Sequence, residues 1–181
     1  MLSYGLRDAA AIQWTRGYRP ASRWRKHARS NTKYWVIRVT EQRPHDHKLG
    51  GRARVLLADD HPAVVKDLCA VLEPEFEVVA TVASGAALIA KAEALAPDVI
   101  VTDISMPGIG GIAAASEILR KNPAARIVFV TVHDEAEMVQ KGMAIGVLGY
   151  VLKLTAGEDL IPAIYAALRG ERHISRLIGR Y

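Results

Sequence analysis

The fold is decided by one stretch, Val99-Ile100-Val101-Thr102-Asp103-Ile104-Ser105-Met106-Pro107-Gly108. Four residues that favour β-strands run into a single carboxylate, and a Pro-Gly turn follows at once. A carboxylate at the C-terminal end of a buried strand lies where an open α/β sheet binds its ligands. A second run of the same kind, residues 55–58, ends in Asp59 and Asp60. We therefore predict that these three acids share one metal ion and that Asp103 is a nucleophile.

The net charge of +5 conceals two different kinds of sequence. Residues 1–52 carry 12 Lys+Arg and 3 acidic residues, a net charge of +9, whereas the remainder carries 12 and 16, a net charge of −4. The basic part shows no sustained helical or strand period, which predicts a disordered extension. Its basic groups interleave with Trp14, Tyr18 and Trp24, a composition typical of segments that contact nucleic acid, and this alternative stays open.

Two whole-chain features bear on location. The single cysteine, Cys69, cannot form an internal disulfide, which fits a reducing cytosol. No apolar run approaches the roughly 20 residues that a membrane span needs, and no signal-peptide core precedes a cleavage site. We expect a cytoplasmic protein that does not bind membranes.

From Arg54 onward, short apolar runs alternate with helical patterns. The predicted strands are residues 55–58, 77–82, 99–102, 127–131 and 148–152. They are apolar on successive residues, as expected for strands that helices cover on both faces. This alternation predicts an α/β fold, a doubly wound five-stranded parallel sheet with right-handed crossovers.

The start of the last helix has two interpretations. Thr155 and Glu158 form a capping-box pattern, but a helix that starts there has Pro162 in its interior, where a hydrogen bond is lost. A start near Asp159 moves Pro162 into the first turn, and we predict this later start.

Polar side chains follow four of the predicted strands, and a parallel sheet brings these strand ends to one edge. They are Asp59 and Asp60, Asp103, Thr131 and Lys153. Carboxylates so close together are unfavourable unless a cation intervenes, and a set of oxygen ligands favours Mg²⁺. A carboxylate can attack phosphorus and become an aspartyl phosphate, while the metal and Lys153 neutralise the phosphoryl oxygens. Thr131 is placed to hydrogen-bond the phosphoryl group.

Several motifs between about Arg54 and Ser175 occur together in one known family. They are Asp59-Asp60, the Asp103-x-x-Met106-Pro107-x-x-x-Gly111 turn, Thr131 and Gly149-Tyr150-Val151-Leu152-Lys153. With these motifs the sequence resembles the receiver domain of bacterial two-component response regulators, which have a flavodoxin-like (CheY-like) fold. Residues 130–134 and 167–171 look closest to the NarL/FixJ branch, whose receivers precede a LuxR-type helix-turn-helix.

The resemblance implies a phosphorylation site that uses Mg²⁺. Asp103 would accept a phosphoryl group from a sensor histidine kinase. Asp60 and Asp103 would bind Mg²⁺ together with the backbone carbonyl of Ser105, and Asp59 would act partly through water.

The resemblance also implies a switch around this site. Lys153 would pair with the phosphoryl group, Thr131 would move toward it, and Tyr150 would swing inward. His61 and His133 would flank the site. Ser105 and His133 would tune the lifetime of the phosphoryl group.

We predict three parts: a basic, disordered extension (1–52), a receiver domain (53–170) and a C-terminal tail or truncated linker (171–181). The switch would act on the surface of the fourth helix, fifth strand and fifth helix, through which the protein would form a homodimer or bind a partner. The sequence stops at Tyr181 without a helix-turn-helix. The alternatives are a fragment of a LuxR-type DNA-binding transcriptional regulator, or a regulator whose basic extension contacts nucleic acid.

Two enzyme classes compete with this interpretation. Gly108-x-Gly110-x-x-Ala113 matches a loose dinucleotide-binding fingerprint, but Asp103 would repel a pyrophosphate that approaches without a metal. Phosphatases of the haloacid dehalogenase type need a second Asp two residues after the nucleophile, where this chain has Ser105. We therefore predict a signalling switch that catalyses only its own phosphorylation and dephosphorylation, and no other enzyme activity.

Overall fold

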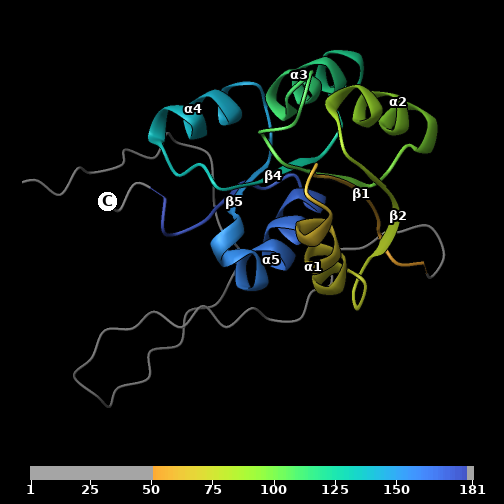
Figure 1. The fold of residues 1–181 in the computed structure, drawn as a ribbon, viewed down its shortest axis with the longest axis horizontal. Coiled ribbons are helices and arrows are strands. Elements are labelled where there is room, and N and C mark those ends of the chain that lie inside the picture. The colour runs from red at the N-terminus through yellow and green to blue at the C-terminus, as the bar shows by residue number, and fades with distance from the viewer. Residues whose placement is uncertain (1–50, 179–181) are drawn as a thin grey trace, which may run out of the picture. The chain divides into compact units, whose positions relative to one another are not determined.

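A computed structural model of the chain describes residues 51–178 (Figure 1). The basic extension was predicted over residues 1–52, of which residues 1–50 lie outside the described residues, so its predicted disorder and nucleic-acid contact stay predictions. No helix in the described range is long and apolar enough to cross a membrane.

Strands and helices alternate along the described chain. In order they are β1 (Arg54–Ala58), α1 (Pro62–Leu72), β2 (Glu77–Val82), α2 (Gly85–Leu95), β3 (Val99–Thr102), α3 (Gly111–Lys121), β4 (Ile127–Thr131), α4 (Ala136–Ala144), β5 (Gly149–Leu152), a 3₁₀ turn η2 (Lys153–Thr155), α5 (Ala156–Leu168) and β6 (His173–Ile174).

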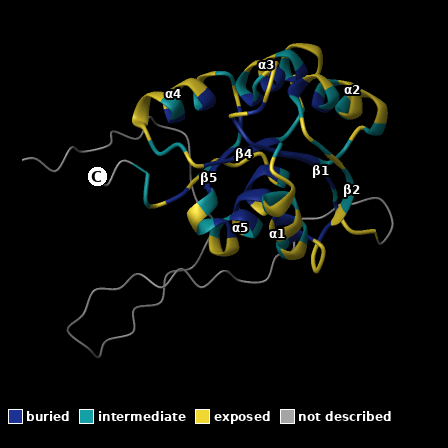
Figure 2. Ribbon diagram, in the orientation of Figure 1, coloured by how far each residue is buried: buried dark blue, intermediate teal, exposed yellow. Residues whose placement is uncertain are grey.

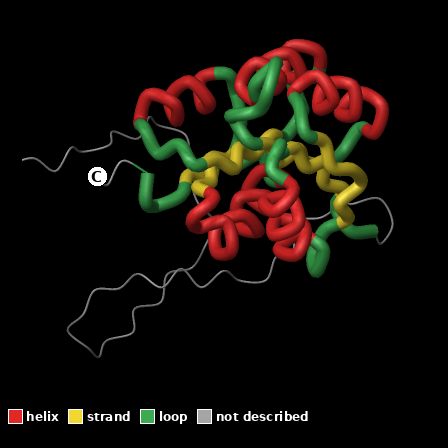
Figure 3. The backbone as a smooth tube through the Cα atoms, viewed as in Figure 1, coloured by secondary structure: helices red, strands yellow, loops and turns green. Residues whose placement is uncertain are grey.

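The strands form one parallel sheet in the order β2-β1-β3-β4-β5-β6. Helices α1 and α5 cover one face, and α2, α3 and α4 cover the other (Figures 1 and 3). This confirms the predicted doubly wound α/β fold. The order of the strands changes direction between β1 and β3, and the crevice at this point is where such sheets bind ligands.

The central strands supply a core on each face of the sheet. Every residue of β3, β4 and β5 is buried, as successive apolar residues predict. Leu57 and Val101 contribute to the core under α1 and α5, while their neighbours Leu56 and Ile100 contribute to the core under α2, α3 and α4. Figure 2 shows the buried strands between helices whose outer sides are exposed.

Backbone packing at the start of α3 positions the loop after β3. Gly111 begins the helix, and its N–H donates to the carbonyl of Ile104 at 2.8 Å. A Cβ at this position would overlap the carbonyl oxygen of Asp103, so only glycine lets α3 start this close to the strand end. The glycine at position 111 therefore allows α3 to pack directly against the Asp103 backbone.

The sheet has a sixth strand that the sequence did not predict. β6 pairs in parallel with the edge of β5 and lies inside residues 171–181, which were predicted to be a tail or linker. Two residues are too short for a strand period, and Ile174 is 43% exposed, so the strand depends on its tertiary pairing with β5.

The predicted start of α5 near Asp159 is wrong. The helix begins at Ala156, directly after the 3₁₀ turn, and contains Pro162 in its interior. Burial of Leu160, Ala163 and Ile164 along its inner face offsets the hydrogen bond that the proline removes. Thr155 is the N-cap, but its side chain makes no capping hydrogen bond, since its hydroxyl donates to Asp159 Oδ2 at 2.8 Å.

Candidate phosphoryl-acceptor site

The candidate site lies at the C-terminal ends of β1 and β3. Residues Ala58 and Thr102 are paired across the two strands, and the N–H of Asp103 donates to the carbonyl of Ala58 at 2.8 Å. Asp59 and Asp103 therefore directly follow the paired last residues of two neighbouring strands. Their exposed fractions are only 2% and 3%, so two carboxylates are buried side by side at the switch point.

Lys153 connects these two carboxylates. It follows β5, and its Nζ lies 2.7 Å from Oδ2 of Asp103 and 2.6 Å from Oδ2 of Asp59. Burial by itself would lower the pKa of the Lys153 ammonium, but the contacts with Asp103 and Asp59 outweigh burial and raise the pKa above its ordinary value. The ammonium thus supplies the cation that two buried carboxylates require.

The two oxygens of Asp103 have different partners. Oδ1 accepts a hydrogen bond from the backbone N–H of Ile104 at 2.6 Å, and Oδ2 accepts one from Lys153. The hydroxyl of the preceding Thr102 donates to the Asp103 carbonyl at 2.9 Å. The carboxylate is consequently held in one orientation.

Asp59, Asp60 and His61 form an acidic group beside this carboxylate pair. The backbone N–H of His61 donates to Oδ1 of Asp59 at 2.9 Å, and Nδ1 of His61 lies 2.9 Å from Oδ1 of Asp60. One ligand atom from each of the three residues lies within 4.8 Å of the others, so the group can hold a metal ion. The carboxylate oxygens of Asp59 and Asp60 suit Mg²⁺, which is bound through one or two carboxylates and otherwise by water or phosphate oxygens.

A second group of side chains surrounds the loop after β4. Ser105 Oγ lies 2.8 Å from Nε2 of His133, and Thr131 Oγ1 accepts from the His133 backbone N–H at 3.3 Å. The hydroxyl of Tyr150 donates to the carbonyl of His133 at 3.0 Å. His133 is therefore the residue through which Ser105, Thr131 and Tyr150 are connected.

The ring of Tyr150 is fully buried in this structure. It packs edge-on against Phe129, with ring centroids 6.2 Å apart, and Gly142 of α4 leaves room for the two rings. Burial, followed by the negative charges of Glu135 and Asp103, raises the pKa of the Tyr150 hydroxyl. The hydroxyl is thus a neutral hydrogen-bond donor at physiological pH.

The predicted site residues fall into these two contact groups. Direct contacts join Asp59, Asp103 and Lys153, and His61 and Asp60 adjoin Asp59. The side chain of Ser105 contacts His133 rather than the carboxylates. The contact of Lys153 with Asp59 was not predicted, because it depends on the pairing of Thr131 with Leu152 across β4 and β5.

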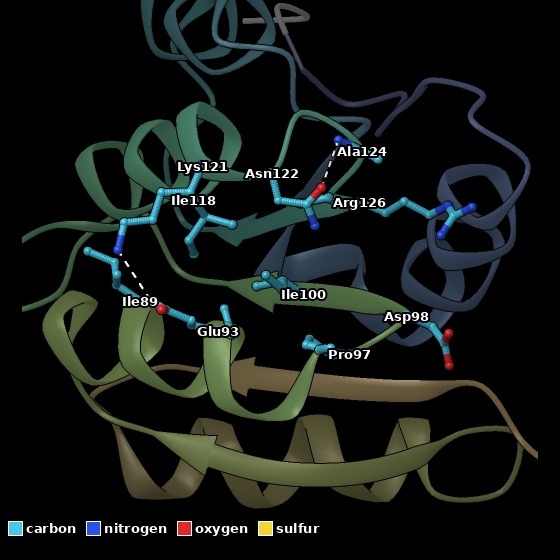
Figure 4. A pocket seen from close by; sticks show the side chains of 13 residues that line it. Ile89, Glu93, Pro97, Asp98, Ile100, Ile118, Lys121, Asn122, Ala124 and Arg126 are labelled. Atoms are coloured by element: carbon cyan, nitrogen blue, oxygen red, sulfur yellow. Dashed lines mark hydrogen bonds and ion pairs between the residues drawn. The ribbon is translucent and has the colours of Figure 1, made fainter.

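One hollow of about 580 Å³ lies elsewhere in the described domain, between the C-terminal ends of α2 and α3 (Figure 4). Its floor is Ile100 at the start of β3, and an ion pair between Glu93 and Lys121, 3.2 Å apart, crosses one side. Ile100 lies near the start of β3 and Asp103 directly follows its end, so the hollow lies toward the opposite ends of the strands. None of its lining residues belongs to the candidate site.

Known proteins match this region in sequence and in structure. Residues 55–165 match the family model of the response regulator receiver domain, inside the predicted part 53–170. The uncharacterized transcriptional regulatory protein YxjL from Bacillus subtilis is 40% identical over 66% of this chain, and the nitrate/nitrite response regulator NarL from Escherichia coli is 36% identical over 70% of it. The matched regions span 56% and 59% of those two proteins.

Solved structures show the same fold. A two-component response regulator of the LuxR family from Aurantimonas is 35% identical and has a TM-score of 0.68 over 72% of this chain and 94% of its own. The receiver domain of NarL from Mycobacterium tuberculosis is 27% identical and has a TM-score of 0.63 over 67% and 100% of the two chains. The chain therefore belongs to the response regulator receiver domain family, with NarL- and LuxR-type regulators among its relatives.

Proposed function

We propose that Asp103 is the phosphoryl acceptor of a two-component signalling switch and that a sensor histidine kinase is the donor. The observation that carries this proposal is the pair of buried carboxylates, Asp59 and Asp103, connected by Lys153 at the switch point of the sheet. The membership of the receiver family and the acidic group beside Asp103 support it.

The chemistry is a transfer from nitrogen to oxygen. A carboxylate oxygen of Asp103 attacks the phosphorus of a phosphohistidine, the P–N bond breaks, and the imidazole of the kinase leaves with the bonding electron pair. Lys153 is held beside Asp103 and neutralises charge on the transferred group. Ile104 N–H fixes the orientation of the carboxylate before the attack.

Asp59 and Asp60, together with Asp103 and the backbone carbonyl of Ser105, would hold Mg²⁺. The bound ion supplies electrostatic stabilisation of the phosphoryl oxygens. Asp59 and Lys153 already form an ion pair in the described structure, so the same carboxylate has an alternative cation when no metal is bound. Thr131 and Tyr150 would then respond to the phosphoryl group through their contacts with the His133 segment.

The test is incubation of the chain with Mg²⁺ and acetyl phosphate, followed by intact mass. We expect one added phosphoryl group in the wild type and in Asp67→Asn, a matched control on the exposed side of α1. We expect none in Asp103→Asn and a sharp reduction in Lys153→Ala. Labelling of Asp103→Asn at the wild-type level would refute the assignment.

We propose regulation of transcription as the output of this switch. The support is the set of relatives, which includes the regulators YxjL and NarL, and the similarity to a structure of RcsB dimers bound to DNA at 30% identity. Salt-dependent binding of DNA by the full chain, lost on deletion of residues 1–50, would assign the contact to the basic extension. Absence of binding at low salt would leave a switch that acts through protein partners.

A further inference from the structure

The turn that carries Lys153 has little support of its own. It is the 3₁₀ turn η2, Lys153–Thr155, and no side chain caps its start. Leu154 in its middle is 83% exposed, so it contributes little packing that could hold the turn. The side chain of Lys153 is long and flexible. The position of its ammonium between Asp59 and Asp103 therefore depends on how firmly the two ends of this turn are held.

Both ends of the turn contact one serine that follows α5. Ser175 is only 2% exposed. Its Oγ accepts a hydrogen bond from the N–H of Leu152, the residue before the turn, at 3.2 Å. The same oxygen lies 3.2 Å from Oγ1 of Thr155, the last residue of the turn. Ser175 thus connects the residue that enters the turn with the residue that ends it.

Asp159 of α5 joins the two hydroxyl groups, and we call Thr155, Asp159 and Ser175 the polar cluster. Oδ2 of Asp159 accepts from the hydroxyl of Ser175 at 2.6 Å and from the hydroxyl of Thr155 at 2.8 Å. Burial by itself raises the pKa of Asp159. The hydrogen bonds from Ser175 and Thr155, followed by the charges of His173 and Arg176, outweigh burial and hold this pKa below its ordinary value. Asp159 is therefore a charged acceptor at neutral pH, and hydrogen bonds to a charged acceptor are stronger than neutral ones.

Pairing at the edge of the sheet brings Ser175 to this place. Ile174 of β6 pairs with Tyr150 of β5, and the N–H of Ser175 donates to the carbonyl of Tyr150 at 2.9 Å. Ser175 lies beyond residues 55–165, the part of the chain that matches the receiver family model. The chain after α5 consequently returns to the turn that carries Lys153 and supplies a buried side chain to it.

We propose that the polar cluster positions Lys153: by fixing both ends of η2, it keeps the ammonium between Asp59 and Asp103. This positioning does not depend on any reaction, but its consequence for phosphoryl transfer rests on the proposed function. The polar cluster acts on the transfer through Lys153 and is not itself catalytic. A displacement of about 1 Å in a group that acts on the transition state can lower a rate about a hundredfold.

The first arm of the test measures the mobility of Lys153 without a phosphoryl donor. Relaxation of ¹³C at the Cε atoms gives an order parameter for each lysine side chain, and we expect a higher value at Lys153 than at the exposed Lys91 of α2. In Ser175→Ala and in Thr155→Val, Lys153 should lose about half or more of this difference. Thr155→Ser keeps the hydroxyl group and should keep the wild-type value.

A destabilised variant at the other edge of the sheet separates positioning from a general loss of stability. Val78→Ala removes packing from β2, and β2 and β6 are the two outer strands of the sheet. It should lower the midpoint of urea unfolding and leave the order parameter of Lys153 unchanged. Retained hydrogen-exchange protection of β3 and β4 shows that each variant is folded. An order parameter that Ser175→Ala and Thr155→Val leave unchanged, or that Val78→Ala lowers equally, would overturn the proposal.

The second arm is the rate of phosphorylation with Mg²⁺ and saturating acetyl phosphate. We expect Ser175→Ala and Thr155→Val to react about tenfold more slowly than the wild type, and Thr155→Ser and Val78→Ala to react at the wild-type rate. A mobile Lys153 together with a wild-type rate would overturn the role of the polar cluster in the transfer. A wild-type chain that takes up no phosphoryl group would contradict the proposed function instead, and the first arm would still decide whether the polar cluster positions Lys153.

Discussion

Lys153 lies 50 residues from Asp103 in the sequence, yet its Nζ is 2.7 Å from Oδ2 of that carboxylate. The same ammonium is 2.6 Å from Oδ2 of Asp59. One cation therefore forms ion pairs with two carboxylates that follow different strands. This arrangement makes Lys153 important both for the fold of the site and for the proposed transfer of a phosphoryl group.

Removal of the Lys153 charge should destabilise the protein. Lys153→Met keeps the length of the side chain but leaves two buried carboxylates without their shared cation. We expect the free energy of unfolding to fall by about 3 kcal/mol, as for other broken buried ion pairs. Urea unfolding in the absence of divalent cations measures this loss, and Lys91→Met, an exposed lysine on α2, is the control. Equal stability of the two variants would contradict the bridging role.

The contribution of Lys153 to the free energy of unfolding should decrease at alkaline pH. Burial by itself lowers the pKa of Lys153. The contacts with Asp103 and Asp59 raise this pKa by more than burial lowers it, so the pKa in the folded chain is above the ordinary value of 10.5. A group whose pKa is raised on folding contributes in full below its unfolded pKa, and the contribution is lost as the pH rises through the folded pKa. The stability difference between wild type and Lys153→Met should thus stay constant between pH 7 and 9 and shrink above about pH 10. A difference that grows in that alkaline range would be inconsistent with the ion pair.

Gly111→Ala should distort the candidate site, although Gly111 is not itself one of the site residues. The new methyl group overlaps the carbonyl oxygen of Asp103, so α3 or the strand end must shift. We expect a loss of about 1–3 kcal/mol, as for other overpacked positions, together with slower phosphorylation by acetyl phosphate. Gly157→Ala is the matched control, because a Cβ there meets nothing within 4 Å. Wild-type stability and labelling rate in Gly111→Ala would show that the contact does not constrain Asp103.

Tyr150→Phe tests the connection between β5 and the His133 segment. The variant keeps the buried ring but removes the hydroxyl that donates to the carbonyl of His133. We expect the free energy of unfolding to fall by about 1 kcal/mol, and hydrogen exchange at residues 131–135 to become faster. Unchanged exchange in this segment would mean that the ring alone, and not the hydrogen bond, holds the loop.

Local sequence patterns were enough to place the acidic residues of the candidate site at the ends of neighbouring strands. Asp59, Asp60 and Asp103 each follow a buried strand directly, so a parallel sheet must bring them to one edge. The contact between Lys153 and Asp59 could not be predicted, because it depends on strand register and on a side-chain conformation. The same is true of the hydrogen bond between Ser105 and His133.

The two errors in the fold have a common origin in tertiary contacts. β6 carries only His173 and Ile174, and its pairing depends on the edge of β5 rather than on a pattern of its own. The early start of α5 depends on burial of Ala156 and Leu160, which offsets the local cost of Pro162. The pairing of β6 is not encoded in the spacing of neighbouring residues, whereas a start of α5 after Thr155 was one of the two interpretations that the sequence offered.

The most direct test of the central claim is to locate the phosphoryl group on the chain. Borohydride reduces an aspartyl phosphate to homoserine, which tandem mass spectrometry assigns to a residue after incubation with Mg²⁺ and acetyl phosphate. We predict homoserine at position 103 and unmodified aspartate at Asp59 and Asp60. Homoserine at position 59 or 60, or a phosphorylated chain that borohydride leaves unreduced, would contradict the assignment of Asp103 as the acceptor.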